Sequence, residues 1–192
     1  EFAETIGIIF AILLATFAKA QVARRKYAKY ELHKIAANEV RYNSRTFVEL
    51  ISRIQAEAGI ATHVVKDLQT MPIWMVSFLV FMLDLLGAEY VTSSHAIATF
   101  IATKDINNQG SQYLPEESKE FVDEIEKMFE TIEKEGSFTI TIASRDHKLI
   151  QSGLLDSLEN GIQLYADYLR KGVATEENLQ KIRSMRGDVI VD

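Results

Sequence analysis

Two apolar blocks constrain the fold of this 192-residue chain more than any other feature. Residues 6–18 (IGIIFAILLATFA) and residues 72–86 (PIWMVSFLVFMLDLL) hold one charged side chain between them, Asp84. A helix that is apolar on every side is buried, either in a protein core or in a membrane. Both blocks are shorter than the roughly 20 residues of a comfortable membrane span, so both environments stay open.

A basic cluster follows the first block and favours the membrane. It consists of Arg24, Arg25, Lys26 and Lys29, interleaved with tyrosines. Such a cluster beside an apolar helix is typical of an anchor whose cations contact anionic lipid headgroups, and a solvated helix face is the alternative. Residues 19–66 carry ten Lys and Arg against four Asp and Glu. If both blocks insert, the positive-inside tendency predicts that this segment lies on the cytoplasmic side.

Asp84 lies near the end of the second block. An acid within a membrane is costly unless it is paired or at the interface, and such residues often mark ion or proton paths. We therefore single out Asp84 as a candidate intramembrane acid. The alternative is a position at the headgroup level, or in water at the end of a core helix.

Helical signals dominate the chain, which has only two prolines and nine glycines. The pattern predicts one long helix from Phe2 to Tyr42, followed by further helices over residues 44–59, 61–69, 72–86, 88–103, 115–136, 148–170 and 175–185. The stretch 88–103 leaves a strand possible because it is rich in Thr and Val.

The clearest strand signal is the period-two alternation of residues 137–143 (SFTITIA). We expect residues 188–192 (DVIVD) to pair with it, since an isolated strand cannot satisfy its backbone. The predicted fold is therefore mainly α, a helical bundle with a long N-terminal helix and a minor β element. Residues 1–104 form an apolar and basic region, 105–114 a linker, and 115–192 an acidic, mostly helical subdomain.

Motifs for chemistry are scarce. The chain has no cysteine, which excludes disulfides and thiolate metal sites. Its four histidines, His33, His63, His95 and His147, match no metal-binding spacing, although His63 and His95 could face a flat cofactor such as haem. No glycine-rich phosphate loop or serine-nucleophile motif occurs. The sequence predicts no metal and no cofactor, and it favours a protein that is not an enzyme.

Charge and hydropathy then point to a class of function. The net charge of -6 argues against a dedicated nucleic-acid binder. We expect a membrane-associated structural or regulatory subunit that engages a protein partner, or a second copy of itself, with anionic lipid as a further ligand. The alternative is a cytoplasmic, soluble helical bundle that binds an apolar ligand or cofactor in its core.

Overall fold

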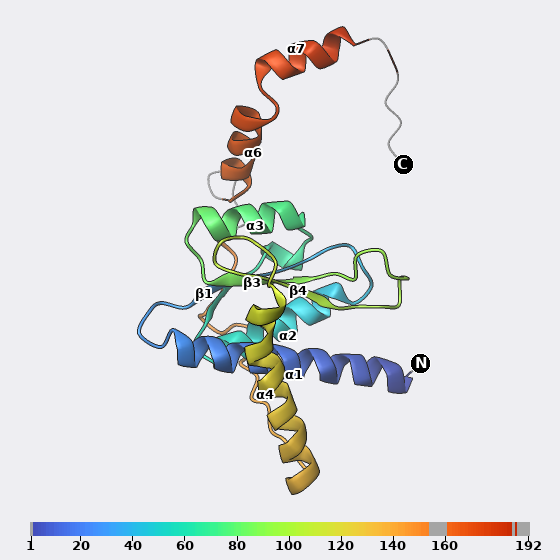
Figure 1. Cartoon of the computed structure of the whole chain (residues 1–192), viewed down its shortest axis with the longest axis vertical. Helices are drawn as coiled ribbons and strands as arrows, with labels where there is room; N and C mark the ends of the chain where they lie inside the picture. Colours follow the sequence, from blue (N-terminus) through green and yellow to red (C-terminus); the bar gives the residue numbers. More distant parts are fainter. Residues whose placement is uncertain (1, 154–160, 186, 188–192) are drawn as a thin grey trace.

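A five-stranded sheet forms the centre of the molecule in the computed structural model, which describes residues 2–153, 161–185 and 187 (Figure 1). The strands lie in the order β4-β3-β1-β2-β5. Their bounds are β1 His33–Asn38, β2 Ala61–His63, β3 Gly87–Val91, β4 Thr103–Ile106 and β5 Ile150–Gln151. Strand β1 is parallel to β2 and β3, and β2 is parallel to β5, whereas β4 runs antiparallel to β3.

The fold is thus α/β, and the prediction of a mainly α bundle is wrong. The predicted helix from Phe2 to Tyr42 ends at Lys26, and β1 follows it. A central parallel strand is buried on both faces, so it lacks the alternation that marks a half-buried strand. In β1 the residues after His33 are all buried, with the sequence KIAAN, and this run is also compatible with a helix.

Helices cover both faces of the sheet (Figure 1). Helix α1 (Phe2–Lys26) and helix α2 (Ser44–Glu57) lie on one face, and α3 (Ile73–Met82) lies on the other. Strand β1 shows this division, because Ile35 packs among α3 side chains and Ala36 packs among side chains of α1 and α2. The two apolar blocks of the sequence therefore supply the helices that cover opposite faces of one sheet.

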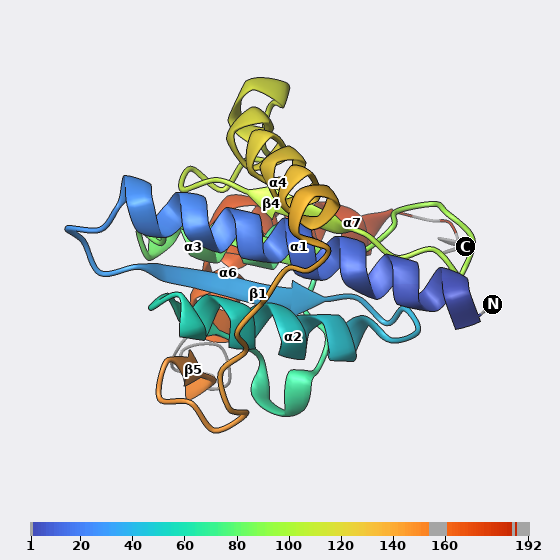
Figure 2. The same ribbon diagram turned by 90° about the horizontal axis from the view of Figure 1, so that it is seen from below.

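Helix α1 is long and apolar enough, by length and composition alone, to cross a membrane over Glu4–Lys26. It lies across the sheet beside α2, and α4 (Pro115–Glu135) crosses it on its outer side (Figure 2). Leu14 and Ala18 are buried where α1 meets Met128 of α4. Helix α3 has only ten residues, and Asp84 lies beyond its end.

Several helices agree with the sequence prediction because their ends carry turn and cap residues. Helix α2 is followed by Gly59 at φ 84°, and α4 begins at Pro115 and ends before Gly136 at φ 73°. Helix α7 (Glu176–Ser184) begins after Thr175, whose side chain accepts a hydrogen bond from the Asn178 backbone. The predicted helix over residues 61–69 is wrong, because β2 and a short 3₁₀ turn (Lys66–Leu68) occupy it. Over residues 88–103 the helix is also wrong, and the alternative of a strand is correct for the part that β3 occupies.

The predicted strand over residues 137–143 is also wrong. This segment is irregular, and Phe138 and Ile140 pack against α1 and α4 instead of joining the sheet. The rings of Phe17 and Phe138 meet edge to face, with centroids 5.6 Å apart. Its proposed partner, residues 188–192, lies outside the described residues. An alternating pattern therefore indicates an extended segment with one buried side, but such a segment need not pair with another strand.

The predicted helix over residues 148–170 is only partly present. Strand β5 begins it, and helix α6 (Gly161–Gly172) forms its last part. Helix α6 packs on α3, where the ring of Phe78 lies 5.4 Å from that of Tyr165 and 4.8 Å from that of Tyr168. Helix α7 then extends away from the sheet (Figure 1).

Candidate functional site

The topology points to one edge of the sheet. Helix α2 connects β1 to β2 on one face, and α3 connects β2 to β3 on the other. The chain therefore leaves β1 and β2 toward opposite faces at their carboxyl ends, whereas β3 leads into the antiparallel β4. In open α/β sheets, ligands bind beyond the carboxyl ends of the strands at such a switch point. Residues 39–43 follow β1 at this edge, and residues 92–102 follow its parallel neighbour β3 at the same edge.

Arg41 joins these two segments. Its guanidinium donates to the backbone carbonyls of Ser94, at 3.0 Å, Ala96, at 3.0 Å, and Ile97, at 2.8 Å. Its Nε donates to Glu39 Oε1 at 3.0 Å. The Arg41 side chain is 12% exposed. A planar guanidinium with five donors can hold several carbonyls in a fixed arrangement, so Arg41 determines the shape of the loop that follows β3.

Glu39 completes this contact from the end of β1. Its Oε1 also accepts the Thr92 hydroxyl at 2.7 Å, directly after β3. Burial raises the pKa of Glu39, but the hydrogen bonds from Thr92 and Arg41 outweigh it and leave the pKa below its usual value. The site therefore holds a carboxylate and a guanidinium side by side at neutral pH.

Ser94 is an exposed serine of the loop that follows β3. Its backbone has φ 50°, a left-handed conformation that non-glycine residues rarely adopt, and its N–H donates to Thr92 Oγ1 at 3.1 Å. The neighbouring Ser93 Oγ is buried and has no partner among the described residues. His95 follows and is exposed. Backbone strain of this kind is concentrated at functional sites.

The start of α2 lies beside Glu39 and Arg41 and lines a cavity with them. Asn43, at φ 60°, precedes the helix without capping it through its side chain. A cavity of about 430 Å³ lies here, lined by residues that include Asn43, Arg45 and Thr70. Free N–H groups at a helix N-terminus and an arginine together favour an anionic ligand.

The residues singled out from the sequence lie elsewhere. Arg25 pairs with Glu124 of α4 at 3.0 Å, and Lys26 pairs with Glu120 at 3.6 Å. Arg24 and Lys29 are exposed near the end of α1. Contact of this cluster with lipid headgroups stays a prediction. Asp84 is exposed at φ 51° in the turn between α3 and β3, so it does not lie within an apolar helix.

The arrangement of the histidines also differs from the one that the haem hypothesis requires, in which His63 and His95 face one flat cofactor. His63 pairs with His33 across β1 and β2, with Nδ1 of His33 3.0 Å from Nε2 of His63. The ring centroids are 5.2 Å apart, and the ring planes differ by 22°. His95 lies in the loop after β3. Among the described residues, no group of three His, Asp or Glu side chains could hold a metal.

Sequence reasoning missed Glu39, Arg41 and the loop around Ser94. The available signal was a polar run after each short buried segment, EVRYNS after β1 and TSSH after β3. It becomes informative only when residues 33–38 and 87–91 are interpreted as strands, because only then do both runs meet at one sheet edge.

Comparison with known proteins agrees with this α/β architecture. Residues 10–135 match the family model described as phosphoglucomutase/phosphomannomutase, alpha/beta/alpha domain I. A protein from Thermus thermophilus described as a phosphomannomutase is 14% identical, with a TM-score of 0.60 over 83% of this chain and 31% of that one.

The second similar structure is the exocytosis-sensitive phosphoprotein pp63/parafusin, a phosphoglucomutase from Paramecium, in its open form. It is 16% identical, with a TM-score of 0.59 over 82% of this chain and 31% of that one. The chain thus spans about a third of the length of both structures. No curated protein sequence matches it.

Proposed function

Because the chain belongs to the phosphoglucomutase/phosphomannomutase family through domain I, we propose that it serves phosphoryl transfer on sugar phosphates. The names of its relatives describe enzymes that move a phosphoryl group between positions of a hexose. Since the chain spans about a third of those structures, we propose that it supplies one part of such a mutase.

Family membership overturns the expectation of a membrane-associated structural subunit. The apolar blocks supply the helices over the two sheet faces, and their inner sides are buried against protein. The soluble alternative is favoured, although not as a helical bundle. We propose a cytoplasmic location, as expected for an enzyme of phosphorylated sugars. A protein partner or a homo-oligomer stays a prediction.

The Arg41 contact with the loop after β3 carries the proposal. It holds Ser94 in a left-handed backbone conformation at the carboxyl edge of the parallel strands, where Ser94 is exposed. Phosphoryl transfer needs an oxygen acceptor and positive groups that stabilise the transferred charge. Ser94 Oγ supplies the acceptor, while Arg45 and the start of α2 supply positive potential.

We propose that Ser94 carries the phosphoryl group between sugar positions. Its Oγ forms a bond to phosphorus while the bond from phosphorus to the sugar oxygen breaks. The hydroxyl proton passes to that sugar oxygen, so the products are phosphoserine and a free sugar hydroxyl. The reverse step then returns the phosphoryl group to another hydroxyl of the sugar.

Mass spectrometry of the purified chain tests this proposal, both as isolated and after incubation with glucose 1-phosphate. We expect one added phosphoryl group on the Ser94 peptide. Ser93→Ala is the matched control, since it changes the neighbouring hydroxyl and should keep the modification, whereas Ser94→Ala should lose it. A peptide that stays unmodified in all three proteins, or modification that survives Ser94→Ala, would refute the role of Ser94.

A further inference from the structure

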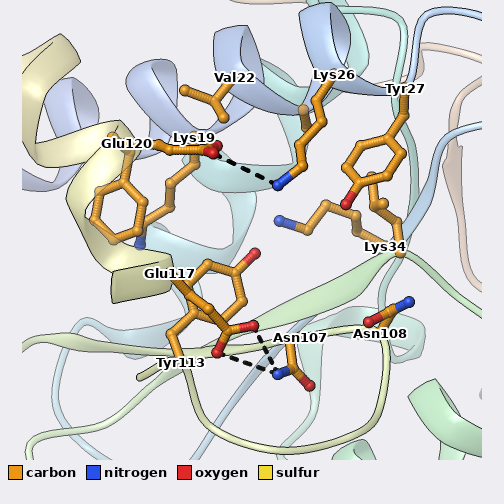
Figure 3. A pocket seen from close by; sticks show the side chains of 13 residues that line it. Lys19, Val22, Lys26, Tyr27, Lys34, Asn107, Asn108, Tyr113, Glu117 and Glu120 are labelled. Atoms are coloured by element: carbon orange, nitrogen blue, oxygen red, sulfur yellow. Dashed lines mark hydrogen bonds and ion pairs between the residues drawn. The ribbon is translucent and has the colours of Figure 1, made fainter. Parts of the chain in front are cut away.

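A second polar pocket lies at the opposite end of β1, between α1, the start of α4 and the turn after β4. Its volume is about 100 Å³. Figure 3 shows the amine ends of Lys26 and Lys34 and the hydroxyl ends of Tyr27 and Tyr113 pointing toward a common space. Lys34 belongs to the start of β1, whereas Arg41 follows its end, so this pocket is separate from the site around Ser94.

The innermost group of the pocket is the buried ammonium of Lys34. It donates to Glu89 Oε1, and Glu89 Oε2 accepts from Gln55, whose Oε1 accepts the Thr62 hydroxyl at 2.8 Å. Burial alone lowers the pKa of Lys34, but attraction to Glu89 outweighs it and the pKa lies above its ordinary value. Lys34 is therefore charged at neutral pH, and Glu89 is fully engaged.

Several hydrogen-bond donors at the pocket lack acceptors. An ammonium has three N–H donors, and Lys34 uses one of them, toward Glu89, within the described part of the chain. The hydroxyls of Tyr27 and Tyr113 make no hydrogen bond to described residues. Burial raises the pKa of Tyr113, so its hydroxyl keeps its proton. These donors face the space of the pocket, so they are free to bind an acceptor that enters it.

The carboxylates that line the pocket are already used. Glu117 accepts from the Asn107 side chain, at 2.9 and 3.2 Å, and from the Leu114 backbone at 2.9 Å. Glu120 pairs with Lys26 at 3.6 Å, and both side chains are 54% exposed. Exposed pairs contribute only about 0 to 1 kcal/mol, so Lys26 can turn to a ligand at little cost.

We propose that this pocket binds a small oxyanion, a phosphate or a carboxylate group, held by Lys34, Lys26 and the hydroxyls of Tyr27 and Tyr113. Its oxygens accept from the donors that the chain leaves unused. The volume suits a single such group rather than a whole sugar phosphate. The site is accessory to the Ser94 site and does not depend on the role proposed there.

Tyrosine side-chain NMR provides a local test. The chain has seven tyrosines, which can be labelled with ¹³C at Cζ, and Tyr27→Phe and Tyr113→Phe assign the two signals. The whole chain is titrated with sodium phosphate, sodium acetate or sodium chloride at equal ionic strength. We expect the Tyr27 and Tyr113 signals to move to a plateau with phosphate, with acetate, or with both. The effective anion identifies the group that the pocket takes.

Two variants make the test specific. Lys26→Gln removes one exposed cation of the pocket and should raise the apparent Kd about tenfold. Arg45→Gln alters the other site and should leave the titration unchanged. Signals that respond to phosphate and acetate only as they do to chloride would mean that water alone fills the pocket and would overturn the proposal. So would a response that Arg45→Gln abolishes and Lys26→Gln does not affect.

Discussion

At the scale of single residues, two cations organise the two ends of the central strand. Lys34 is buried at its start against Glu89, and Arg41 lies just after its end against backbone carbonyls. Neither role can be predicted from the local sequence, because each partner comes from β3 or from the loop after it. In the sequence, a charged residue near a short apolar segment cannot be identified as solvated or as buried with a partner.

Replacing Arg41 with Lys tests its control of the loop. A lysine keeps the charge but cannot reach several carbonyls at once, so we expect unfolding to require about 2 kcal/mol less free energy. Amide hydrogen exchange should accelerate within residues 92–102, and urea denaturation measures the stability. Arg45→Lys, at the exposed start of α2, is the control. Equal exchange in both variants would show that Arg41 does not hold the loop.

At the scale of elements, the sequence revealed helices better than strands. Helices α2, α4 and α7 were predictable because glycine, proline or threonine stands at their ends and one face is apolar. The central strands were not, since β1 and β3 are buried on both faces and lack a period of two. The site could not be found before the strands were known, because it exists only where their ends meet.

The turn after β4 offers a test of packing between elements. Gly110 has φ 76°, and a Cβ there would lie 2.4 Å from the Ser77 carbonyl oxygen of α3. We expect Gly110→Ala to lower the unfolding free energy by about 3 kcal/mol, from the positive φ and the clash with backbone. Gly136→Ala is the matched control, with φ 73° and open space around it, and should cost about 1 kcal/mol. Similar urea midpoints for both variants would mean that the turn does not pack on α3.

At the scale of the whole molecule, acid should loosen the sheet through the histidine pair. Burial, and the nearby His33, lower the pKa of His63 from 6.5 to about 4. The unfolded chain then binds a proton at His63 more readily than the folded chain does. The contribution of the neutral His63 to the free energy of unfolding is therefore present above pH 6.5 and is lost as the pH falls toward 4.

Between about pH 7 and pH 5 we expect the protonation of His63 to lower the free energy of unfolding by about 2 kcal/mol. Urea denaturation at both pH values measures it, and His63→Gln should show a correspondingly smaller loss. His147→Gln, a histidine outside the pair, serves as the control and should behave like the parent. A loss that is the same in all three proteins would assign the acid sensitivity to other groups.

The buried chain of hydrogen bonds from Lys34 through Glu89 and Gln55 to Thr62 also restricts how the sequence can change over time. It connects β1, β3, α2 and β2, and removing one member of a buried ion pair costs about 3 to 5 kcal/mol, a large part of a domain's stability. Replacing both charges together with apolar side chains can be neutral. Lys34 and Glu89 should therefore be lost only as a pair, so that relatives retain both or neither.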